Sequence, residues 1–162
     1  MPMTTSSLNV NMDTAGSSAP LLSEILTKVN NAKDKTKKIQ VLRDNDSVPL
    51  RQVLKGAFDP NIKWDLPAGV PPYKKNDAPA GTEHTTLHQE ARRLWHFVKG
   101  ADEKLSKTRK EVMFIQVLEG LQEDEAELLI NVKEKSLNKV YKGLTDAVVK
   151  EAFGWNEDYK TS

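Results

Sequence analysis

The stretch Leu22-Ser23-Glu24-Ile25-Leu26-Thr27-Lys28-Val29 decides the fold class of this chain. Its aliphatic residues stand at i, i+3, i+4 and i+7, the spacing that places them on one face of an α-helix. Pro20 comes just before the stretch, and proline suits the first turn of a helix. The pattern therefore predicts an amphipathic helix whose apolar face must pack against other elements.

Helical spacing recurs along most of the chain, separated by segments rich in turn residues. A second helix is expected over about residues 34–43, a third after the capping residue Ser47, and a last one after Thr145. We therefore predict an all-α fold, a single compact bundle of about six or seven short helices. The expected inward residues beyond the first helix are Ile39 and Leu42; Leu50, Val53, Leu54 and Ala57; Leu87, Ala91, Leu94, Trp95 and Val98; Leu105, Val112, Ile115 and Leu118 of a helix over 103–119; and Ala126, Leu129 and Ile130 of a helix over 123–133, which also carries Lys133.

Composition divides the chain into three parts. Residues 1–19 are rich in Ser, Thr, Asn and Gly, and they offer too little apolar surface to offset the cost of ordering. They predict a flexible N-terminal tail. The helical domain is expected over 20–155, interrupted by a long Pro-rich loop at 59–82, and residues 156–162 form a C-terminal tail.

Aromatic residues indicate where the less regular segments pack. Trp95 and Phe97 lie two positions apart, so on one helix they point to different sides. Trp95 belongs to the expected core stripe, and Phe97 covers either a neighbouring helix, which we favour, or a partner. Other aromatic residues expected to pack on the domain are Trp64, Tyr73, Trp155 and Tyr159.

Bulk composition is that of a soluble domain. Of the 162 residues, 29% are charged and 38% hydrophobic, and the net charge is +1. The absence of cysteine is typical of a protein kept in a reducing cytoplasm. No apolar run approaches the ~20 residues that span a bilayer, and the first residues lack a secretory signal. We therefore expect a cytoplasmic protein with no membrane partner.

Charge is segregated along the chain although the net charge is small. Six basic residues and one acid, Asp34, lie between Lys28 and Arg43. Five acids and no base lie between Glu119 and Glu127. A nearly neutral protein with such blocks can present a basic face to a polyanion. The alternative is that both blocks are simply solvated surfaces.

The sequence lacks the motifs that indicate an enzyme. Neither common type of phosphate-binding glycine loop is present. His84 and His88 would share a helical face, but the H-E-x-x-H pattern and a third ligand are missing, so a surface or capping role is favoured over a metal. We predict no enzymatic activity, no catalytic residues, no cofactor and no metal site.

Short patterns near the two ends of the domain occur in a distinctive order. Ile25-Leu26-x-x-Val29 is followed by the basic linker Lys35-Thr36-Lys37-Lys38 and then by Val41-Leu42-x-x-Asn45. Near the end, the turn Gly143-Leu144-Thr145 opens a helix that finishes in Phe153-Gly154. This order resembles the N-terminal DNA-binding domain of ATP-dependent DNA ligases, particularly its compact T4-phage-like form.

In such ligase domains, basic residues and helix N-termini hold the duplex backbone on both sides of a nick. The chain contains no Lys-x-Asp-Gly nucleophile motif, so the resemblance implies DNA binding without strand sealing. Together with the basic blocks, it implies phosphate contacts from Lys35, Lys37, Lys38, Lys133, Lys135, Lys142, Gly143 and Thr145.

A second resemblance concerns origin. The segments Leu54-Lys55-Gly56-Ala57-Phe58-Asp59-Pro60 and Leu66-Pro67-Ala68-Gly69-Val70-Pro71-Pro72-Tyr73 are similar to segments of a family of short proteins from T4-like phages of marine bacteria. This similarity implies a phage origin and indicates no activity.

Two functional hypotheses follow. The first is a stand-alone, non-catalytic module that binds duplex DNA through its backbone, in the cytoplasm of an infected bacterial host. The second is a protein-interaction module or a structural component of a virion, which would contact a phage or host protein through the Pro-rich loop or the N-terminal tail.

Overall fold

The computed structural model describes residues 20–76 and 85–161. Over these ranges the chain forms eight α-helices and one 3-10 helix, with no strand beyond isolated bridges, which confirms the predicted all-α fold. The predicted N-terminal tail, the end of the Pro-rich loop and His84 lie outside the described residues. The elements are α1 (Leu22–Asn31), α2 (Lys35–Asp44), α3 (Val48–Phe58), α4 (Leu87–Glu90), η2 (Ala91–Phe97), α5 (Lys107–Gly120), α6 (Glu123–Lys133), α7 (Leu137–Val140) and α8 (Asp146–Phe153).

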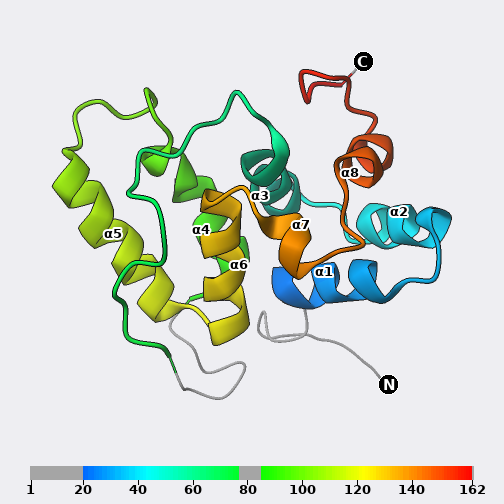
Figure 1. Cartoon of the computed structure of the whole chain (residues 1–162), viewed down its shortest axis with the longest axis horizontal. Helices are drawn as coiled ribbons and strands as arrows, with labels where there is room; N and C mark the ends of the chain where they lie inside the picture. Colours follow the sequence, from blue (N-terminus) through cyan, green and yellow to red (C-terminus); the bar gives the residue numbers. More distant parts are fainter. Residues whose placement is uncertain (1–19, 77–84, 162) are drawn as a thin grey trace, which may run out of the picture.

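The helices pack around one hydrophobic core. Helices α1, α2 and α8 lie together at one end of the molecule, α5 lies at the opposite end, and α3 and α6 lie between them (Figure 1). Helix α2 packs on both α1 and α8, and α3 packs on α6. The predicted apolar stripes supply fully buried residues, among them Leu26, Val29, Leu42, Leu50, Leu54 and Leu129.

Local capping explains where several helices begin and end. Ser47 Oγ accepts the amide of Leu50 at the start of α3, and Thr145 Oγ1 accepts the amide of Val148 at the start of α8. Both caps were expected from the sequence. Helix α8 ends at Gly154, which has φ 65°, the left-handed conformation that glycine adopts at least cost.

The fourth predicted helix changes geometry part of the way along, and this moves Trp95 out of the core. The α-helical hydrogen bonding stops after α4, and η2 continues as a 3-10 helix with about 3.0 residues per turn. Its buried residues are accordingly three apart, namely Ala91, Leu94 and Phe97, whereas Trp95 is 49% exposed. The prediction of Trp95 in the core is wrong, and the core position of Phe97 is confirmed.

The buried face of α5 also differs from the expected one. The helix begins at Lys107, later than predicted, after a cap from Ser106. The expected inward residue Val112 is 41% exposed. The spacing of apolar residues predicted the wrong face of α5 because it did not allow for a buried lysine, Lys110. The buried row consists of Lys110, Phe114 and Leu118, while Leu105 and Ile115 are only half-buried.

Lys110 is buried because it has a partner in the loop before α4. Its Nζ lies 2.8 Å from Oδ2 of Asp65, and both side chains are largely covered. The hydrogen bond from Lys110 holds the pKa of Asp65 below its usual value, although burial acts in the opposite direction. The pair thereby joins α5 to the chain segment that runs past it.

Stability should depend on pH through this pair. Because the pKa of Asp65 is lowered by folding, the folded protein keeps the carboxylate charged where the unfolded chain already binds a proton. The contribution is present above about pH 4, the unfolded value, and is lost as the pH falls through the folded pKa. Urea unfolding of the parent and of Asp65→Asn should therefore show a stability difference that shrinks below about pH 4. A difference that stays constant down to acidic pH would contradict this assignment.

The end of the chain folds back on the domain, as its aromatic residues predict. Tyr159 is 4% exposed, and its ring lies edge-on to Trp155, with centroids 6.1 Å apart. Trp155 also packs on Phe153 at the end of α8. Tyr159 hydroxyl donates to Asp146 at the start of the same helix. These contacts hold residues 155–161 against both ends of α8.

Candidate nucleic-acid interface

The structure brings the basic segment near the start of the chain next to the turn before α8. Gly143 N–H donates to Asn30 Oδ1 of α1 over 2.8 Å. A Cβ on Gly143 would lie 2.6 Å from Lys38 Cε and 3.3 Å from the Asn30 carbonyl oxygen, so only glycine permits this close approach without displacing a neighbour. Two segments more than a hundred residues apart in sequence therefore meet at one place.

Tyr141 anchors the same turn to α1. Its side chain is buried and its hydroxyl forms a hydrogen bond with Thr27. Burial raises the pKa of Tyr141 to about 12, so the hydroxyl stays neutral near neutral pH. The neighbouring residue Lys142 is exposed, and its position is set by this anchor and by the Gly143 hydrogen bond.

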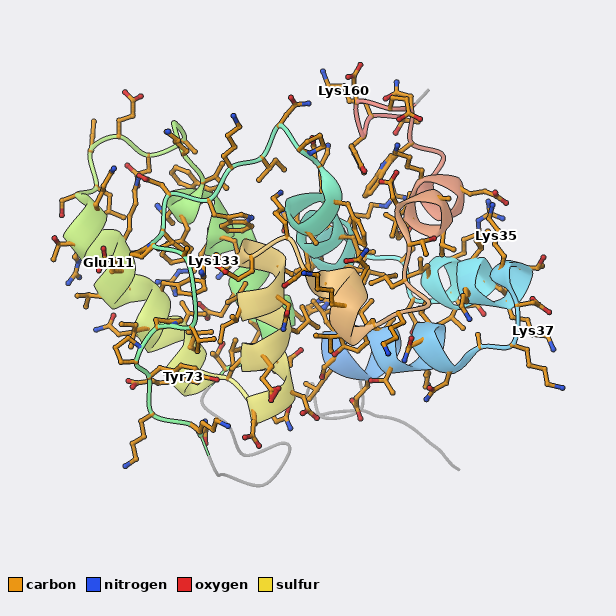
Figure 2. The ribbon with its side chains drawn as sticks, in the orientation of Figure 1. Lys35, Lys37, Tyr73, Glu111, Lys133 and Lys160 are labelled. Atoms are coloured by element: carbon orange, nitrogen blue, oxygen red, sulfur yellow. The ribbon has the colours of Figure 1, made fainter. Side chains whose placement is uncertain are left out.

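We use the name α2 surface for Lys33, Lys35, Lys37, Lys38 and Lys142. Lys33, Lys37 and Lys142 are exposed, and Figure 2 shows Lys35 and Lys37 at the end of the molecule that α2 forms. Lys38 is half-buried, and its Nζ donates to the Ala32 carbonyl oxygen. Lys35 pairs with Glu151 of α8 at 3.1 Å, with both side chains more than half exposed.

Lys133, one of the expected DNA contacts, is a structural residue. It is 7% exposed, and its Nζ donates to the carbonyl oxygens of Pro67 and Gly69, each over 2.9 Å. It also pairs with Glu134, whose pKa this contact lowers. Figure 2 shows Lys133 between α6 and the chain that passes it. Its ammonium group holds the Pro-rich loop in place.

Lys135 has a similar structural role. Its Nζ donates to the carbonyl oxygens of Gly56 and Asp59, over 2.6 Å and 2.9 Å, and burial lowers its pKa. The residue has φ 58°, the left-handed conformation, and the amides of Lys135 and Ser136 donate back into the last turn of α6. Together, Lys133 and Lys135 fasten the segment from α3 to Gly69 onto the end of α6.

The start of α8 is less suited to a phosphate than the sequence suggests. The Gly143 amide is already bonded to Asn30, and Thr145 Oγ1 caps its own helix. Asp146 occupies the first turn and pairs with Lys150 at 2.9 Å. A carboxylate already stands where the helix dipole would attract an anion, so the turn contributes to the α2 surface mainly through Lys142.

Sequence reasoning missed residues that shape this region. Asn30 positions the turn, but an asparagine at the end of a helix does not indicate a contact with a glycine over a hundred residues away. Arg43 lies in the basic block, yet its guanidinium donates to the carbonyl oxygens of Glu151 and Ala152 at the end of α8. These bonds fix α2 against α8 and use that charge structurally.

Among the described residues, no group of three His, Asp or Glu side chains is arranged to hold a metal ion. In the same ranges, no helix has the length and apolar character needed to cross a membrane.

The chain belongs to a family of unknown function, DUF6433, whose model matches residues 25–139. The matched span runs from within α1 to within α7, includes the lysines of α2, and stops before Lys142. Comparison with curated proteins finds no match, and comparison with solved structures finds none either.

Proposed function

We propose that the protein is a non-catalytic module that binds duplex DNA through its phosphate backbone, using the α2 surface. The observation that carries the proposal is the contact of Gly143 with α1 and with Lys38 of α2, which brings the turn that carries Lys142 to the basic segment. Lysines from two distant parts of the chain thus supply one surface. A lysine ammonium is a strong phosphate ligand and carries no information about base sequence.

The contacts that these lysines make within the protein leave capacity for a ligand. An ammonium group has three donors, and Lys38 gives one of them to the Ala32 carbonyl oxygen. The Lys35–Glu151 pair is exposed, and such surface pairs contribute only about 0–1 kcal/mol, so a phosphate can displace the carboxylate. Asp34 also stands beside these lysines, but its carboxylate caps α2 by accepting the Lys37 amide.

The same considerations limit the kind of binding. Net charge is +1, so long-range attraction to DNA is weak and the affinity should depend on local contacts. No base-reading element is part of the proposal, since the α2 surface consists of lysines at helix ends and turns. The resemblance to ligase DNA-binding domains supports a duplex as the partner. A phage origin and a place in the cytoplasm of an infected host belong to the same proposal.

The salt dependence of binding tests the proposal. Each phosphate contact contributes roughly 0.9 to the slope of log K against log salt for duplex DNA. The double variant Lys37→Ala, Lys142→Ala should therefore flatten the slope by roughly 2 units, and by the same amount on unrelated sequences. Fluorescence anisotropy on nicked and intact duplexes, at several salt concentrations, measures this slope.

A matched control separates local contacts from net charge. Lys74 and Lys160 are exposed, and Figure 2 shows Lys160 away from Lys35 and Lys37. The double variant Lys74→Ala, Lys160→Ala removes the same charge and should leave the slope nearly unchanged. Equal effects of the two double variants, or no binding by the parent at about 50 mM salt, would contradict the proposal.

A protein-interaction or virion role is the second candidate, and one feature favours it. A groove of about 620 Å³ lies between the segment after α3 and the α6–α7 junction. Its lining includes the apolar side chains of Phe58, Ile62, Trp64 and Leu66, and it lies next to the lysines that fasten the loop. Concave sites of this volume with apolar side chains in the lining are typical of ligand binding, and a side chain of a partner protein is a ligand of suitable size. Absence of DNA binding would leave this candidate as the better account.

A further inference from the structure

Trp95 marks a second surface, at the end of the molecule opposite the α2 surface. The loop between η2 and α5 forms that end, far from α2 and α8 (Figure 1). Trp95 is 49% exposed, an uncommon position for a side chain that gains so much from burial. Sequence spacing assigned this residue to the core, so its exposure calls for a physical account.

The exposed indole is held in one orientation. The rings of Trp95 and His96 are stacked, with centroids 3.9 Å apart and planes at 29°. His96 Nδ1 lies 2.8 Å from Asp102 Oδ2, which fixes the imidazole in turn. His96 covers one face of the indole, and 49% of the residue remains exposed. A further flat ring would extend the existing stack.

Exposed cations stand shortly before and after this aromatic pair in the chain. Arg92 precedes Trp95 by three residues, and positions three apart in a 3-10 helix lie on the same face. The Lys99 amide donates to the Lys63 carbonyl oxygen over 2.7 Å, so these lysines lie on adjacent chain segments. Like charges facing each other across paired backbones repel, and an anion bound between them would relieve the repulsion.

Two more lysines belong to the same region. The pKa of Asp65 is lowered first by its hydrogen bond with Lys110 and further by the charges of Lys107 and Lys99, so these three cations act on the same carboxylate. The Lys104 amide forms a hydrogen bond with Asp102, the residue that holds His96. Glu103, also exposed, opposes these cations, which remain in excess.

Asp65 is a carboxylate on which Lys99 and Lys107 act, but its hydrogen bond is taken by Lys110. Within the described ranges, no ion pair is formed by the side chains of Lys63, Arg92, Lys99, Lys104 or Lys107. The α2 surface differs in this respect, since Lys35 there is paired with Glu151. The chain segments near Trp95 therefore combine cations that form no ion pair among the described residues with an exposed, oriented aromatic ring.

We propose that Trp95, with Arg92, Lys63, Lys99 and Lys107, forms a binding surface for single-stranded nucleic acid. One base stacks on the exposed indole, and neighbouring phosphates bind the lysines and the arginine. A single strand is the fitting partner because its bases can be splayed onto an aromatic ring, whereas bases within a duplex are already stacked. A purely apolar partner would leave the surrounding cations desolvated without compensation.

This surface is independent of the one proposed for duplex DNA. The two lie at opposite ends of the molecule and have no residue in common (Figure 1). Either binding proposal can therefore be wrong while the other one holds. A protein with both would hold a duplex and an adjoining single strand at the same time.

Binding of a fluorescently labelled oligothymidylate of about 12 nucleotides tests the inference by anisotropy. Trp95→Ala should weaken binding by roughly 5- to 150-fold, the range for loss of one base–aromatic stack. Trp95→Phe keeps an aromatic ring and should retain most of the affinity. Lys63→Ala with Lys99→Ala should flatten the salt slope by roughly 1.4 units, at about 0.7 for each contact on a single strand.

Two controls complete the experiment. Val112→Ala alters another exposed hydrophobic residue and should bind oligothymidylate like the parent. Lys37→Ala with Lys142→Ala should change duplex binding and leave oligothymidylate binding unchanged. If the parent does not bind oligothymidylate at about 50 mM salt, or if Trp95→Ala binds as tightly as the parent, the inference is wrong.

Discussion

Replacing Glu125 by alanine should lower the free energy of unfolding by about 3–5 kcal/mol, because it leaves two buried amides without an acceptor. Glu125 lies in the acidic run of the sequence, yet its side chain is completely buried. One carboxyl oxygen accepts the Leu22 amide over 3.0 Å, and the other accepts the Leu87 amide over 2.9 Å. These are the first amides of α1 and α4, so one side chain of α6 connects the starts of two other helices.

Thermal unfolding followed by circular dichroism measures this effect. At about 2–4 °C for each kcal/mol in a domain of this size, the melting temperature should fall by about 10 °C. Glu125→Gln keeps one acceptor but sets an amide NH₂ against the other helix, so it should restore only part of the loss. Glu127→Ala, an exposed acid on the same helix, should melt within a degree or two of the parent. Equal melting of Glu125→Ala and Glu127→Ala would refute the role of the buried carboxyl group.

Phe97→Ala should cost about 3–5 kcal/mol, as large-to-small changes of buried aromatic residues do. Phe97 is 2% exposed and meets Phe114 of α5 edge-to-face, with ring centroids 5.4 Å apart. This buried ring contact joins η2 to α5. Trp95→Ala, two residues earlier, should cost under about 1 kcal/mol because the indole is half exposed.

Urea denaturation of the two variants compares the loss of stability at these two aromatic positions directly. Helical spacing at 3.6 residues per turn assigns Trp95 to the core, whereas the 3-10 geometry assigns Phe97. A larger loss for Trp95→Ala than for Phe97→Ala would show that residues 91–97 are α-helical in solution. A larger loss for Phe97→Ala would support the structure.

Features governed by local interactions could be predicted from the sequence. The stripe of α1 and the face of α3 follow from residues three and four apart, and the caps at Ser47 and Thr145 bond amides three positions away. The change from α4 to η2 could not be predicted in this way. A switch from 3.6 to about 3.0 residues per turn rotates each later side chain, so that Trp95 leaves the core while Phe97 is buried.

The buried polar residues could not be predicted because their partners are distant in sequence. Glu125 bonds amides of α1 and α4, and Lys110 pairs with Asp65 of the long loop. Lys133 and Lys135 looked like free cations, since nothing near them in sequence indicates the carbonyl groups that they bind. Counting charges identifies basic segments, but only the fold shows which of those charges are already used.

The candidate interface was predictable in part. The sequence indicated that lysines of α2 and the turn before α8 act together, and the structure places Lys38 against Gly143. The anchor on Asn30 and the acid at the start of α8 were not foreseen. They change the expected contribution of the turn from amide donors to the single cation Lys142.

Amide NMR spectra of the protein titrated with a short duplex of mixed sequence test the DNA-binding proposal most directly. The account predicts shifts that increase with DNA and cluster on the amides of Lys33, Lys37, Lys38, Lys142 and Gly143, and that fade as salt is raised. Amides beside the groove at Ile62 and Leu137 should stay unchanged. Absence of shifts at low salt, or shifts confined to that groove, would contradict DNA binding by the α2 surface.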